Sequence, residues 1–132
     1  MELKTPFAID QGFDALYGLV IDAYDTDAGV MTGHVDVEPK HLQPAGLVHG
    51  GVFASIAESM TSMGTWVVVS GDGKTAQGLS NQTSFLRPIL EGTIHATCRV
   101  RHRGRTTWVW EVEITDDQER LCSLVRMTIA VR

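Results

Sequence analysis

The sequence predicts an α+β fold in which an antiparallel sheet wraps around one long apolar helix. Residues 51–69 are mostly apolar and small and have helical periodicity, whereas the segments on either side alternate apolar and polar residues, as strands do. In order, these segments are a strand pair, the helix and a run of four antiparallel strands. The length of 132 residues suits one domain, 1–132, with a substantial core.

The first part of the chain is expected to contain a short helix followed by the strand pair. Residues 10–18 fit a helix that ends at a glycine, with Asp10 as its N-terminal cap. The strands are expected at 19–25 and 29–37, because the turn-rich sequence TDAG joins them and Pro39 closes the second.

The long helix, 51–69, has one broad face that is expected to pack on the sheet. That face consists of Val52, Phe53, Ile56, Ala57, Met60, Met63, Gly64 and Val67. The opposite stripe consists of Gly51, Ala54, Ser55, Glu58, Ser62 and Thr65. Solvated helix faces usually carry several charged residues, so this stripe of small residues is expected to be covered. A partner subunit would cover it, or a bound ligand would cover part of it.

Four strands are expected after the helix, at 76–86, 93–102, 107–115 and 121–131. The last three each place their apolar residues on one face, and the sequence DDQE between the last two is typical of a hairpin turn. Because the helix is too apolar for a surface position, the sheet is expected to enclose it.

Composition disfavours several classes of function. The net charge of −5 argues against nucleic acid as a partner. Segment 47–69 is interrupted by Glu58 and many small polar residues, so it is not expected to span a membrane. The start, MELKTPFAIDQGF, lacks the apolar region of a signal peptide, and Cys98 and Cys122 make no disulfide framework. We therefore expect a cytoplasmic protein.

Neither a metal site nor a cofactor is expected. Of the five histidines, only His41 and His49 come near one another, and no cysteine or acid lies at ligand spacing from them. The chain also lacks the Gly-x-Ser-x-Gly elbow of a nucleophilic serine.

Glu58 is the first candidate for chemistry. It is the only charged residue between Gly50 and Gly71, so its surroundings are expected to desolvate it, which is costly without a functional or structural reason. The alternative is a structural acid that pairs with His49 of a partner subunit.

The sequence around Glu58 resembles a known family. The run Gln43-Pro-Ala-Gly-Leu-Val-His49-Gly-Gly51, followed by Glu58 and Ser62, is similar to the hotdog-fold acyl-CoA thioesterases. It most resembles the branch that contains the phenylacetate-pathway, Arthrobacter-type 4-hydroxybenzoyl-CoA and 1,4-dihydroxy-2-naphthoyl-CoA thioesterases. The resemblance covers nearly the whole chain, because the order of elements also matches.

This resemblance implies a mechanism. Glu58 would attack the thioester or activate water, and the Gly50 N–H would polarise the thioester carbonyl. At ~1.5 Å per residue, the two lie roughly 12 Å apart along one helix, so a single carbonyl cannot touch both. Gly50 of one subunit and Glu58 of an antiparallel partner are therefore expected to share a site. A homodimer, or a homotetramer built as a dimer of dimers, follows.

The remaining site residues come from spacing and from the same resemblance. Ser62 lies one turn beyond Glu58 and is expected to bond its carboxylate or position a water. Gln43 and His49 are expected to orient the thioester or its leaving sulfur. The residues assigned to the nucleotide end of coenzyme A are Arg87, Gly104, Arg105 and Thr106, and those assigned to the pantetheine channel are Gly78, Leu79 and Ser80.

The expected function is hydrolysis of an acyl-CoA, with an aromatic or aryl-acetyl group favoured by the resemblance. Two alternatives have different chemistry. One is a hotdog acyl-thioester dehydratase or hydratase, whose signatures are not evident, and the other is a noncatalytic acyl-CoA-binding module, which would not need Glu58.

Overall fold

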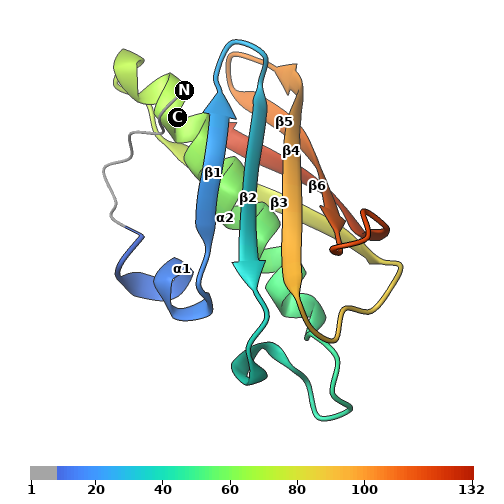
Figure 1. Ribbon diagram of the computed structural model, residues 1–132. Coiled ribbons are helices and arrows are strands. Elements are labelled where there is room, and N and C mark those ends of the chain that lie inside the picture. The colour runs from blue at the N-terminus through green and yellow to red at the C-terminus, as the bar shows by residue number, and fades with distance from the viewer. Residues whose placement is uncertain (1–8) are drawn as a thin grey trace.

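The computed structural model describes residues 9–132 as an antiparallel sheet curled around a long helix (Figure 1). The sheet has six strands in the order β1-β2-β4-β5-β6-β3, and all neighbouring strands are antiparallel. This confirms the predicted α+β class. Residues 1–8 lie outside the described part of the chain. Most of the sequence start on which the signal-peptide prediction rests falls in this segment.

The strands lie close to their predicted positions. Their bounds are β1 Val20–Asp25, β2 Val30–Asp36, β3 Ala76–Phe85, β4 Thr93–Arg103, β5 Thr107–Thr115 and β6 Leu121–Val131. However, β3 does not neighbour β4. It pairs only with β6 and forms one edge of the sheet, with β1 at the other edge. Alternation of apolar and polar residues indicates a strand but does not identify the strand it pairs with. The prediction of four consecutive antiparallel strands therefore did not include the crossover from β3 to β4.

The long helix α2, Gly50–Val69, begins one residue earlier than predicted. The short helix α1 covers Gly12–Tyr17 and ends at Gly18, which has a left-handed φ of 82°. Asp10 is not its cap: Gln11 occupies that position, without a side-chain hydrogen bond. Two short 3-10 turns, η1 Pro39–His41 and η2 Ser70–Asp72, were not predicted.

The sheet-facing side of α2 is buried, with Phe53, Ile56, Ala57, Met60, Met63 and Gly64 in the core. Thr65, placed on the opposite stripe by the sequence, is also buried, because its hydroxyl accepts a 2.9 Å hydrogen bond from the indole of Trp110. Tyr24 donates a 2.6 Å bond to the carbonyl of Gly64. Burial raises the pKa of Tyr24 to about 12. These bonds satisfy polar groups where the helix meets the sheet.

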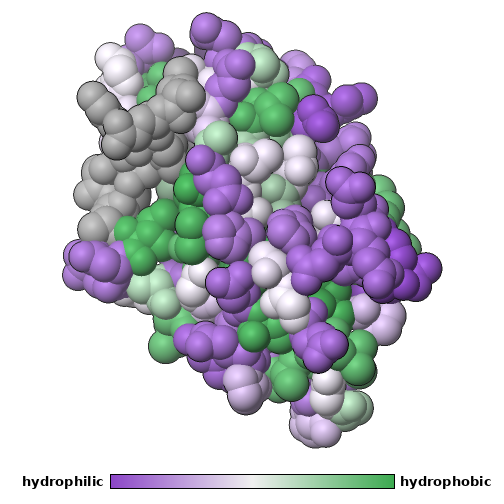
Figure 2. Space-filling view, viewed as in Figure 1, coloured by the Kyte–Doolittle hydropathy of each residue, from purple (hydrophilic) through white to green (hydrophobic). Residues whose placement is uncertain are grey.

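Segment Gly50–Asp72 is long and apolar enough to cross a membrane by length and composition alone. Half of an apolar 18-residue stretch within it is buried inside the fold, as expected for a core helix. The outer side of β1, β2 and β4 carries many hydrophilic side chains (Figure 2).

Candidate functional site

The loop before α2 is held in place by backbone hydrogen bonds. Val48 donates to the carbonyl of Ile89 at 2.8 Å, and His49 donates to that of His41 at 2.8 Å. As a result, Gln43, His49 and Gly50 come together on the wall of a groove of about 620 Å³. The groove also contains Phe53, Phe85, Leu86 and Arg87. Of these, Phe85 and Leu86 were not predicted as site residues, although two apolar residues just before the Pro88 strand break are a usable signal.

The first turn of α2 leaves one backbone donor unused. The N–H of Gly51 donates to Nδ1 of His49 at 2.8 Å, and the N–H of Val52 donates to the carbonyl of His49 at 2.9 Å. The Gly50 N–H has no acceptor within residues 9–132. An unpaired N–H at a helix N-terminus favours developing negative charge, so it is suited to polarise a carbonyl.

Glycine is needed at position 50 for a steric reason. A Cβ atom there would lie 2.6 Å from the ring of Phe85. The Phe85 ring therefore packs directly against the backbone that carries the free N–H and forms one wall beside it.

The two neighbouring histidines have different roles. Nδ1 of His49 caps α2, so its neutral form carries the proton on Nε2, which can donate to a ligand. In contrast, His41 is buried: its Nδ1 accepts from the N–H of Glu38 at 2.9 Å and its Nε2 donates to the carbonyl of Tyr17 at 2.8 Å. Both nitrogens of His41 are thus engaged, and the described chain contains no cluster suited to a metal ion.

The side-chain amide of Gln43 is oriented by its own loop. Its Oε1 accepts a hydrogen bond from the N–H of Ala45. The amide nitrogen has no acceptor in the part of the chain that the structure describes, so it is available to donate into the groove.

Glu58 lies on the side of α2 that faces away from the core. Its side chain is exposed, and no hydrogen bond or ion pair joins its carboxylate to residues 9–132. A Cβ atom on Gly78 of β3 would lie 3.9 Å from its carboxyl carbon, so the two predicted site residues are neighbours. Residues 9–132 do not themselves desolvate Glu58, because this stripe of α2 faces away from the core beside the sheet edge. The expected desolvation therefore requires a second surface, a partner subunit or a bound ligand.

Ser62 follows Glu58 on the same helix. It is half-buried one turn beyond Glu58, but no hydrogen bond connects the two in the described structure. Leu79 and Ser80, next to Gly78, are exposed at an irregularity in the β3–β6 pairing.

The basic hairpin between β4 and β5 contains one unengaged arginine. Arg101 lies 3.7 Å from Glu111, and Arg103 donates to the carbonyl of Thr26 at 2.5 Å and stacks on Trp108 at 4.9 Å. Arg105 is exposed and has no partner among residues 9–132. Within this hairpin, Arg105 is therefore the arginine most available to an anion.

The structure does not bring all the predicted coenzyme A residues together. Thr106 accepts a 2.9 Å bond from Val131 near the start of β3, whereas Arg87 follows the end of that strand. At ~3.3 Å per residue, β3 separates these two ends by roughly 30 Å. Gly104 lies in the tight hairpin turn, where it donates to the carbonyl of Thr107 at 2.8 Å. Arg87 and the hairpin of one chain thus belong to different regions.

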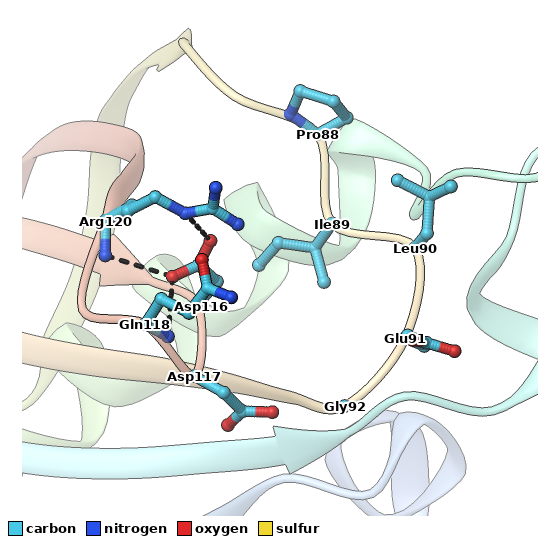
Figure 3. A pocket seen from close by; sticks show the side chains of 9 residues that line it. All are labelled: Pro88, Ile89, Leu90, Glu91, Gly92, Asp116, Asp117, Gln118 and Arg120. Atoms are coloured by element: carbon cyan, nitrogen blue, oxygen red, sulfur yellow. Dashed lines mark hydrogen bonds and ion pairs between the residues drawn. The ribbon is translucent and has the colours of Figure 1, made fainter.

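A separate hollow of about 400 Å³ lies between 88–92 and 116–120 (Figure 3). Asp116 accepts hydrogen bonds there from Nε of Arg120 at 2.7 Å and from the N–H of Gln118 at 2.9 Å. Burial alone would raise the pKa of Asp116, but the bonds from Arg120 and Gln118 outweigh it and hold the pKa below its ordinary value. These bonds serve the turn itself.

The sequence has known relatives. A model of the thioesterase superfamily matches residues 45–123, which include Gly50 and Glu58. A Mycobacterium tuberculosis protein with a provisional esterase name is 37% identical over 119 residues, covering 89% of this chain and 84% of that protein.

Solved structures share the fold. A Pseudomonas aeruginosa thioesterase with a glutamine replaced by alanine has a TM-score of 0.84 and 32% identity, and the match covers 89% of this chain and 83% of the other. Two variants of a Staphylococcus aureus thioesterase have TM-scores of 0.84, at 27% and 26% identity. Each match covers 89% of this chain and 96% of the other chain. One replaces a glutamate and the other a glutamine, at positions fifteen residues apart. These likenesses confirm the predicted hotdog fold.

Proposed function

The chain belongs to the thioesterase superfamily, and from this premise we propose that it hydrolyses an acyl-CoA to a carboxylate and free coenzyme A at sites shared between two subunits. The observation that carries the proposal is a pair of unpartnered groups on α2. The Gly50 N–H has no acceptor and the Glu58 carboxylate has no donor within residues 9–132. Because roughly 12 Å of helix separates them, they complement each other only across an interface.

Subunit pairing through β3 would bring these groups together. The strand is one of the two edges of the sheet and is exposed along much of its length. A two-fold axis near Asn81 would pair β3 with its copy and set Phe85 opposite the region of Gly78 of the partner subunit. Phe85 packs on Gly50, and Gly78 lies beside Glu58. Two equivalent sites per dimer result, and two dimers would form the proposed homotetramer.

The same pairing resolves the separation of the coenzyme A residues. Arg87 of one subunit and Arg105 and Thr106 of its partner would lie at the same end of the interface, where phosphate groups need cations. Pantetheine would pass Gly78, Leu79 and Ser80, beside Gly104 of the hairpin.

The chemistry follows from these positions. In one route the partner subunit's Glu58 attacks the thioester carbon, the C–S bond breaks to release the coenzyme A thiolate, and water hydrolyses the resulting anhydride and supplies the proton that the thiolate takes up. In the other route Glu58 takes a proton from the water that attacks the thioester carbon, and that proton passes to the thiolate when the C–S bond breaks. The Gly50 N–H stabilises the oxyanion, while the Gln43 amide and the His49 Nε2–H donate hydrogen bonds to the thioester or its leaving sulfur. The products are a carboxylate and a thiol. Ser62 would contact the water or the carboxylate in the assembled site.

Two further observations support the proposal. Gln43 and Glu58 are fifteen positions apart, as are the glutamine and glutamate replaced in the Staphylococcus aureus variants. The reaction needs no metal or redox cofactor, since a carboxylate and backbone donors suffice.

Both cysteines are free and buried, which suits the proposed cytoplasmic location. By resemblance, an aromatic or aryl-acetyl group is the favoured acyl part.

Free-thiol release from a panel of aryl- and alkyl-CoA esters tests this function. The wild type is expected to release thiol, and Glu58→Ala to reduce kcat by about a thousandfold. Because Glu58 is exposed and unpartnered in its own chain, the variant is expected to keep the thermal stability of the wild type. Equal rates in both proteins would contradict the proposed role of Glu58. Tight binding without hydrolysis would favour an acyl-CoA-binding module, and a hydrated or dehydrated acyl product would favour the dehydratase class.

A further inference from the structure

A second cavity adjoins the α2 N-terminus next to the groove. It measures about 540 Å³, which is within the range of small-molecule pockets. We call it the α1 pocket, because Phe13 and Leu16 of α1 form one of its walls. His49 and Gly51 line both this pocket and the groove. The two residues that flank Gly50 thus separate two adjacent hollows.

The wall formed by α1 is apolar and exposed. Leu16 is 66% exposed and Phe13 is 62% exposed, the largest exposed fractions among the large hydrophobic residues of the described chain. The two residues are three positions apart, so they lie on one side of the short helix. Leu42 and Val52 extend the apolar lining. The cost of exposing these side chains to water would be reduced by an apolar ligand.

This wall is fixed to α2 by hydrogen bonds. Ser59 of α2 donates to Oδ1 of Asp14 at 2.6 Å, and the Tyr17 hydroxyl lies 3.0 Å from the hydroxyl of Ser59. Burial raises the pKa of Tyr17, so its hydroxyl stays a neutral donor. The ring of Phe13 packs edge-on against that of Tyr17 with centroids 5.1 Å apart. The pocket is therefore largely preformed.

The two hollows differ in the charges beside them. The groove contains Arg87, which has no ion pair in the described chain, and the amide of Gln43. The cation of the α1 pocket is Lys40, and Glu38 neutralises it at 3.1 Å. A thioester whose carbonyl oxygen meets the Gly50 N–H has two substituents, the acyl group and the sulfur with its phosphate-bearing carrier. The unpaired arginine favours the carrier in the groove and leaves the α1 pocket for the acyl group.

We propose that the α1 pocket binds an uncharged, apolar or aryl acyl group of the thioester, and that Phe13 and Leu16 determine which acyl groups the enzyme accepts. This inference rests on the proposed hydrolase function. It assigns specificity to the short helix α1, while the reacting groups lie on α2.

Filling the pocket tests the assignment. Leu16→Trp should reduce kcat/KM for decanoyl-CoA and phenylacetyl-CoA by about tenfold or more relative to acetyl-CoA, since apolar pockets discriminate by such factors. Two matched tryptophan substitutions serve as controls. Leu86→Trp in the groove should affect all three esters equally, and Leu90→Trp, which is 59% exposed and lines neither the groove nor the α1 pocket, should affect none. The proposal is overturned if Leu86→Trp shows the selectivity instead, or if Leu16→Trp slows all esters equally.

A binding measurement separates failure of this pocket from failure of hydrolysis. In the Glu58→Ala background, calorimetry with decanoyl-CoA and free coenzyme A measures how much the acyl group adds to affinity. Leu16→Trp should remove this increment and leave the affinity for coenzyme A unchanged. That result would support the pocket even if the wild type hydrolysed no ester. No increment, or one insensitive to Leu16→Trp, would overturn the pocket even if hydrolysis were fast.

Discussion

The two halves of the candidate site lie on one helix and differ in how completely their own chain prepares them. At the N-terminus of α2, the loop is held by Ile89 and His41, His49 caps the helix, and one N–H remains free beside a groove. Eight residues later, Glu58 is exposed and has no partner in the described chain.

This difference indicates where each half obtains its chemical environment. An oxyanion donor must be fixed in advance, and the chain itself fixes the Gly50 N–H. A carboxylate becomes a stronger nucleophile or base when water is excluded, and one chain alone does not exclude water from Glu58. The second half therefore needs a surface from outside its own chain, which a partner subunit would supply together with the substrate.

After the loss of Glu58 itself, the largest effect is expected from disturbing the prepared half. Gly50→Ala adds a Cβ atom that meets the Phe85 ring, so the ring or the backbone must shift. A misplacement of this kind should lower kcat by about a hundredfold, measured by thiol release. Gly71→Ala is the matched control, because open space surrounds that position. Unchanged activity in Gly50→Ala would show that neither the N–H nor the ring needs its present position.

A smaller effect on catalysis is expected from changes in the basic hairpin between β4 and β5. In the proposed dimer this hairpin lies on the same subunit as the Glu58 half of the site. Arg105→Ala should raise KM for an acyl-CoA about tenfold with kcat nearly unchanged, since a hydrogen bond to a charged group contributes on this scale. Arg101→Ala, whose side chain already lies near Glu111, should leave KM as it is. Equal effects of the two substitutions would point to general surface charge and not to a specific phosphate contact.

His49, the N-cap of α2, has a structural role that can be measured separately from a role in the reaction. His49→Ala should reduce the free energy of unfolding by about 1 kcal/mol through loss of the N-cap, whereas asparagine at this position can keep the cap. Urea denaturation measures the free energy of unfolding of both variants. If His49→Asn restores stability but not kcat, the imidazole Nε2–H has a role in the reaction; restoration of both would assign His49 to the cap alone.

The smallest effect concerns acid stability. The turn that contains Asp116 packs near Ile89, which holds the loop before α2. Because the pKa of Asp116 is lowered in the fold, its contribution is present above about pH 4 and is lost as pH falls through the folded-state pKa. The melting temperature of the wild type should therefore fall more steeply below pH 4 than that of Asp116→Asn. Parallel curves would contradict this role.

The fold was largely predictable because burial imposes periodicity. One face of α2 and alternate residues of the strands must be apolar to form the core, so their positions can be inferred from sequence. The edge position of β3 could not, because strand pairing depends on contacts distant in sequence. Asp10 fits the pattern of a cap, yet the helix begins beyond it, since helix termini are decided by local geometry.

Candidate site residues could be proposed from the sequence, whereas their surroundings could not. The family resemblance carried by Gln43, Gly50 and Glu58 implied the two halves of the candidate site, and the roughly 12 Å between the last two already indicated a second subunit. The sequence did not show that Glu58 is exposed in its own chain, that Thr65 bonds Trp110, or that Arg103 is engaged by backbone carbonyls. Each of these depends on which side chains meet in three dimensions.

Subunit complementation tests the shared site most directly. Dimers are purified through two different tags in two arrangements: Gln43→Ala on one chain with Glu58→Ala on the other, or both substitutions on one chain with a wild-type partner. A site shared between subunits predicts about half of wild-type activity in the first arrangement, which keeps one intact site, and little in the second. The reverse result, with activity only when both substitutions share a chain, would contradict the account.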